Sequence, residues 1–136
     1  MSNVHATTYT VYPTGVDPDT LDGMSEAHSF TITVQWRSPH KWAVLRNREA
    51  LGTDGCWDYE SLPSGREDHW LATHRFSLDE ALRLAQAHVD HIPVNGLTWH
   101  QWEHYRALDA EEARRAYRAE VGPSNGAYWK KTHYPN

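Results

Sequence analysis

Residues 69–92 constrain the fold of this chain more than any other segment. Over residues 69–76 the side chains alternate with the period of two that a pleated strand imposes. Ser77 then occupies an N-cap position, and Glu80 follows three residues later, which is the pattern of a capping box. The apolar residues of 78–92 fall on one helical face. The segment therefore predicts a strand that leads into a helix built to lie across a sheet.

Three further strands are predicted before this segment. Residues 29–37 alternate cleanly, and residues 41–47 return after a short turn, so the two should form an antiparallel hairpin. Residues 56–62 follow an Asp-Gly turn and predict another strand. Together with residues 69–76 they predict an antiparallel β-meander of about four strands, with one face covered by the helix at 78–92. The opposite face should be exposed to water and carry these side chains: Thr31, Thr33, Gln35 and Arg37.

Two more capping boxes predict a C-terminal helical extension. Thr98 and Gln101 indicate a helix that starts at about Trp99, and Asp109 with Glu112 indicates a second start. Gly122 and Pro123 should end that helix. We therefore expect one α+β domain over 1–136, made of an N-terminal strand and loop (1–28), a core of sheet plus helix (29–92), C-terminal helices (93–122) and a tail (123–136).

Composition argues against several classes of protein. The formal net charge is -5, whereas a general nucleic-acid binder is normally strongly basic. The single cysteine, Cys56, excludes an internal disulfide. No secretory signal pattern and no apolar run of membrane-spanning length occurs, so we expect a cytoplasmic protein with no membrane partner.

The candidate binding residues are tryptophans and basic side chains. Residues 29–48 contain basic residues, no acid and two tryptophans, so this hairpin could contact phosphates or an acidic protein surface. The chain has seven tryptophans, the side chain that most often anchors protein interfaces. We expect a non-enzymatic module that binds a protein partner through the open sheet face or the C-terminal helices, with DNA binding by the hairpin as the alternative. The candidates are Arg37, Lys41, Trp42, Arg46, Arg48, Trp99, Trp102 and Trp129.

A metal site is a further alternative. Residues 100–104 read His-x-x-Glu-His, in which His100 and His104 lie one helical turn apart, as in inverted zinc-protease motifs. His88 and His91 could join them to surround Zn²⁺. The other reading makes His88 a half-buried helix residue and His91 a favourable cation at a helix end. We expect no catalytic residue and no cofactor, with a zinc site or zinc hydrolase as the alternative.

Residues 69–85, HWLATHRFSLDEALRLA, resemble the junction between sheet and helix in plant AP2-type DNA-binding domains. Those domains place a three-stranded sheet on a helix and read DNA with Arg and Trp from the strands. The resemblance implies that DNA contacts would come from Arg37, Trp42, Arg46 and Trp57.

A broader resemblance covers about half of the chain. The residues that carry it are similar to those of small proteins of actinobacteria and their phages, a group that carries no assigned activity. It implies a phage accessory or host-interaction protein and no mechanism. Its segments are 28–30, 42–44, 57–60, 63–64, 74–76 and 94–96.

Overall fold

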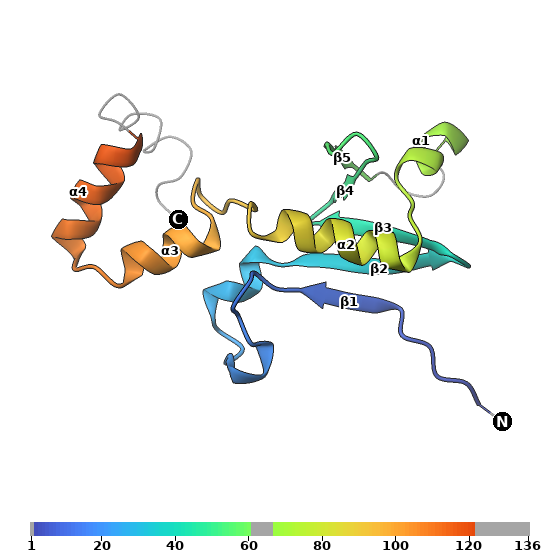
Figure 1. Cartoon of the computed structure of the whole chain (residues 1–136), viewed down its shortest axis with the longest axis horizontal. Coiled ribbons are helices and arrows are strands. Elements are labelled where there is room, and N and C mark those ends of the chain that lie inside the picture. Colours follow the sequence, from blue (N-terminus) through green and yellow to red (C-terminus); the bar gives the residue numbers. More distant parts are fainter. Residues whose placement is uncertain (1, 61–66, 122–136) are drawn as a thin grey trace. The chain divides into compact units, whose positions relative to one another are not determined.

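The computed structural model describes residues 2–60 and 67–121, and Figure 1 shows their helices and strands. The chain forms two compact units, residues 1–89 and residues 90–136. The first unit holds a sheet with its covering helix, and the second holds the C-terminal helices. In the described residues, no helix is long and apolar enough to cross a membrane.

The described part of the first unit contains a five-stranded antiparallel sheet whose strands follow chain order, so the predicted α+β class and meander are confirmed. The predicted hairpin and the strand after the Asp-Gly turn are present, although the first hairpin strand starts late, because residues 26–30 form a 3-10 helix. The N-terminal strand predicted within residues 1–28 is present and joins the sheet. A three-residue strand after the hairpin was not predicted. The strands are β1 (Thr8–Val11), β2 (Ile32–Ser38), β3 (Lys41–Arg46), β4 (Glu49–Leu51) and β5 (Trp57–Tyr59).

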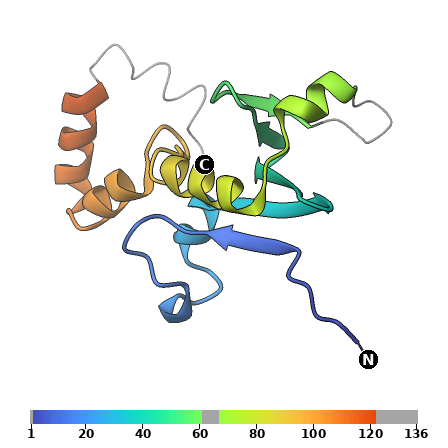
Figure 2. The same ribbon diagram turned by 45° about the vertical axis from the view of Figure 1, so that its right-hand side comes forward.

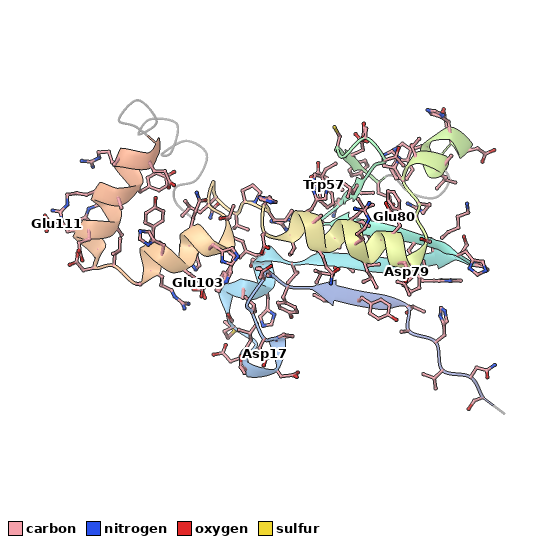
Figure 3. All side chains as sticks on the ribbon, viewed as in Figure 1. Asp17, Trp57, Asp79, Glu80, Glu103 and Glu111 are labelled. Atoms are coloured by element: carbon pink, nitrogen blue, oxygen red, sulfur yellow. The ribbon has the colours of Figure 1, made fainter. Side chains whose placement is uncertain are left out.

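Helix α2 (Leu78–Val89) covers one face of this sheet, as the sequence predicts. It contacts β1, β2 and β3 and runs along them in both views (Figures 1 and 2). The buried helix residues are small, which allows close approach to the fully buried aliphatic side chains of the strands. The Ser77 hydroxyl accepts a hydrogen bond from the Glu80 N–H at 3.3 Å, which caps the first turn. Both acidic residues of that turn, Asp79 and Glu80, are labelled in Figure 3.

The predicted strand over residues 69–76 is wrong, because most of it forms helix α1 (Asp68–Thr73). Only Phe76 keeps a strand contact, as its N–H and C=O exchange hydrogen bonds with Trp42 at 2.9 and 2.8 Å. Trp70 and His74 are four residues apart, and their rings stack at 4.0 Å with planes 4° apart. Trp70 and His74 therefore fit the spacing of a helix as well as the alternation of a strand. A segment of eight residues is too short to distinguish a helix from a strand by pattern alone.

The sheet face opposite α2 was expected to be fully wet, and this is also wrong in part. Thr31, Thr33, Gln35 and Arg37 are half-buried. Ala43 lies opposite Gln35 and is fully buried, as is Ala50 on the same face. A network of charged and polar side chains lies at one end of this face, and it is described with the candidate site.

The described part of the second unit contains α3 (Trp99–Arg106) and α4 (Ala110–Val121). Both predicted capping boxes are confirmed, since Thr98 and Gln101 cap each other and the Glu112 N–H donates to Asp109 Oδ1 at 2.9 Å. The predicted helix end at Gly122 and Pro123 lies outside the described residues.

A tyrosine joins the two helices of this unit. The Tyr105 hydroxyl of α3 donates a hydrogen bond to the Glu120 carboxylate of α4, and its ring meets that of Tyr117 at 6.1 Å. Burial and then the Glu120 carboxylate raise the pKa of Tyr105 to about 12.

Tyr105→Phe should remove the highest-pH component of the tyrosinate absorbance titration. The folded chain holds this phenol proton more tightly than an unfolded chain, whose tyrosine pKa is about 10. The contact therefore stabilises the helix pair fully below pH 10 and loses this contribution as pH rises towards 12. Tyr59 is 62% exposed, and Tyr59→Phe should leave the high-pH component intact. The same component surviving in Tyr105→Phe would contradict this assignment.

Candidate functional site

The β2–β3 hairpin, the chain before β1 and the start of α2 enclose an open groove of about 540 Å³. Trp36 and Trp42 are directly opposite in the β2–β3 register, so both indole rings project from the same face. The hairpin turns through Pro39 and His40, and His40 has a φ of 61°. The lining residues are His5, Trp36, Pro39, His40, Trp42, Ser77 and Leu78.

Aromatic rings surround Trp42 on several sides. The ring of His5 lies 6.0 Å from that of Trp36 and 6.3 Å from that of Trp42, and the Tyr9 ring lies 5.7 Å from Trp42. Trp42 itself is only 5% exposed, whereas Tyr9 is 36% exposed. Trp42 is therefore a fixed wall of the groove, and the half-buried Trp36 is the tryptophan ring that a ligand can cover.

The groove carries no formal charge on the side chains that the structure describes as lining it. The polar groups on its lining side chains are the Ser77 hydroxyl, which accepts from the Glu80 N–H, two imidazoles and two indole N–H groups. An uncharged, ring-lined hollow favours apolar ligands, because it offers little compensation for a buried charge.

The four basic residues predicted as a binding surface are only partly brought together. Arg37 and Lys41 line a second hollow of about 560 Å³ with Asp68 and Arg75. Arg37 donates to Gln35 and forms an ion pair with Glu60. Arg46 lies opposite Glu49 across β3 and β4, and burial lowers the pKa of Arg46. Arg48 is exposed. Two of the four cations thus already face an acid of the same chain.

The Glu60 carboxylate lies at the centre of a polar network that the sequence did not reveal. Its side chain is 6% exposed and pairs with Arg37 through one oxygen and with Arg75 through the other, the latter at 3.0 Å. The Arg75 guanidinium also lies 5.5 Å from the centre of the Trp70 ring. This network therefore connects the end of β2, the residue after β5 and the segment that leads into α2.

His74 forms the other half of this network. Its Nδ1 lies 2.7 Å from the Trp70 carbonyl oxygen and its Nε2 lies 2.8 Å from Asp58 Oδ2. The Thr73 hydroxyl also lies 2.9 Å from Nδ1, so both ring nitrogens have partners. Asp58 and Glu60 are two residues apart, and this spacing is the signal that could have indicated two acids on one side of a strand.

The histidines proposed as zinc ligands have other neighbours. His88 belongs to the first unit, where its ring lies 6.1 Å from that of Trp57, labelled beside α2 in Figure 3. In the second unit, His100 pairs with Asp90 at 3.1 Å and His104 contacts the Tyr105 ring. His91 is exposed. Among the residues that the structure describes, no three His, Cys, Asp or Glu side chains are grouped as metal ligands would be. Zinc binding thus stays a prediction.

The three C-terminal tryptophans differ in exposure. Trp99 is 5% exposed, so it serves the interior of its unit. Trp102 is half-buried, and Trp129 lies outside the described residues. The aromatic groove of the first unit was missed because it depends on the pairing register of β2 and β3, which periodicity alone does not give.

No family model, no curated protein and no solved structure matches this chain.

Glu60→Gln should lower the free energy of unfolding by about 3 kcal/mol, because it removes the buried charge that pairs with both Arg37 and Arg75. Urea denaturation followed by circular dichroism measures this change. Glu80→Gln is the matched control, since Glu80 pairs with Arg83 on the exposed side of α2 and its loss should barely move the midpoint. Equal midpoints for the two variants would show that the Glu60 pairs contribute little.

Proposed function

We propose that this chain is a non-enzymatic binding module that holds a proline-rich segment of a protein partner in the aromatic groove. The observation that carries the proposal is the gathering of the Trp36, Trp42 and His5 rings around an uncharged hollow. Tryptophan and tyrosine contribute large, rigid contact areas to interfaces.

The chemistry of the groove favours proline among apolar ligands. Proline-rich segments are already extended in the polyproline II conformation, and they dock into grooves walled by aromatic rings. Trp36 supplies a partly exposed ring beside the buried Trp42. A phosphate would need charged partners, and the described lining side chains carry no formal charge.

The proposal keeps the class of partner expected from the sequence and relocates the site. The predicted anchor Trp42 contributes to the groove, whereas Trp99 is buried within its own unit. The nucleic-acid alternative is less favoured, because Arg37 and Arg46 each face an acid of the same chain. On the sequence resemblance alone, the partner belongs to the cytoplasm of an actinobacterial host, with this chain as a bacterial or phage accessory protein.

An array of proline-rich decapeptides, titrated against intrinsic tryptophan fluorescence, tests this function. At least one peptide should bind with a dissociation constant below about 1 mM. His40→Asp, which places a carboxylate at the rim of the groove, should weaken that binding roughly tenfold. Aspartate tolerates the positive φ of residue 40, so the hairpin turn should persist.

His69→Asp provides the matched control, since His69 is exposed on α1 and does not line the groove. It should leave peptide affinity unchanged. A short DNA duplex is titrated in parallel. Absence of peptide binding, together with salt-sensitive DNA binding that Arg37→Ala and Arg46→Ala abolish, would replace this proposal with the nucleic-acid alternative.

A further inference from the structure

Strand β1 forms an edge of the sheet. In the described part of the chain it pairs with β2 on one side, and no strand pairs with its other side. An open edge presents unpaired backbone N–H and C=O groups and is a template for another strand.

The register shows which backbone groups of β1 face outward. The Trp36 N–H donates to the Thr7 carbonyl at 2.8 Å, so the peptide groups of Thr7 face β2. Antiparallel pairing repeats this orientation at every second residue, so the backbone N–H and C=O groups of Tyr9 and Val11 also face β2. The N–H and C=O groups of Thr8 and Thr10 therefore point to the open edge.

The two edges of the sheet differ in protection. The opposite edge strand, β5, has three residues and carries Asp58, and both its shortness and its charge discourage pairing. β1 has four residues, and all but Val11 are exposed. It contains no charge and no proline, and the β-bulge lies elsewhere, between Trp36 and Ser38. β1 therefore carries none of the charges, prolines or bulges that keep edge strands apart.

We infer that two copies of this chain pair antiparallel through β1, so that their two sheets become one continuous sheet. This inference is independent of the proposed peptide binding. With the two-fold axis at Tyr9, Thr8 of each copy lies opposite Thr10 of the other, and the outward groups of both meet as a hydrogen-bonded pair. The same register sets Tyr9 opposite its own copy, an aromatic cross-strand pair of the kind that stabilises sheets.

Charge favours a second copy as the occupant of this edge. The chain carries a formal net charge of -5, so most contacts between two copies meet like-charge repulsion. Residues 2–16 contain no Asp, Glu, Lys or Arg, which makes the neighbourhood of β1 an exception. The strand is also self-complementary, because the Thr-Tyr-Thr sequence reads the same in both directions.

Analytical ultracentrifugation of the full chain from about 5 to 500 μM tests this pairing, which should give a concentration-dependent dimer. Thr10→Pro removes one outward N–H and leaves the bonds to β2 intact, so it should raise the dimer dissociation constant at least roughly tenfold. Thr10→Lys, which charges the edge, should act in the same direction. Thr20→Lys, on an exposed 3-10 helix, is the control and should still form the dimer.

Amide hydrogen exchange shows whether β1 itself is the interface. At high concentration the Thr8 and Thr10 amides should become protected, whereas Tyr9 and Val11 should be protected at every concentration because they face β2. A monomer throughout the range overturns the inference. A dimer that both Thr10 variants leave intact, with Thr8 and Thr10 still exchanging freely, overturns it too.

Discussion

The attachment of residues 74–76 to the sheet is the constraint on which the rest of the first unit depends. His74 binds Asp58, Arg75 binds Glu60, and Phe76 exchanges backbone hydrogen bonds with Trp42. Three consecutive residues are thus fixed, one to β5, one to the residue just after β5, and one to β3. Because α2 begins at Leu78, this attachment sets where the helix starts and how it lies on the sheet face.

The same attachment shapes the groove. Trp42 exchanges both of its backbone hydrogen bonds with Phe76 and lies opposite Trp36 in the β2–β3 register. A residue held in this way has little freedom, and its indole ring becomes a rigid wall. Ser77 and Leu78 follow directly after Phe76, and both line the groove. The polar network thus positions an apolar binding surface although it shares no residue with it, since Glu60 and its partners line the other hollow or lie buried.

The elements that the sequence predicts correctly are those set by neighbouring residues. The caps at Ser77, Thr98 and Asp109 each need only a partner three residues away, and all three form. The segment at 69–76 was misread because Trp70 and His74 fit two periods, and the bond from His74 to Asp58 joins residues that are distant in the sequence. β4 has three residues, too few to show alternation. The groove and the Glu60 network require a strand register, which is a property of pairing and not of local pattern.

The charges of this unit are distributed unevenly. Basic residues of β2 and β3 are matched by acids on β4 and just after β5, so much of the local charge is neutralised within the sheet. The region from Ser2 to Val16 contributes none of it, and β1 brings uncharged backbone and ring surface to the other edge. Tyr9 lies between the aromatic surface and the open edge of the sheet. Its ring contacts Trp42, while the backbone groups of its neighbours Thr8 and Thr10 face outward. The ring of Tyr9 and the backbone N–H and C=O groups of Thr10 therefore make different contacts. A strand added at this edge would extend the aromatic surface without occupying the groove.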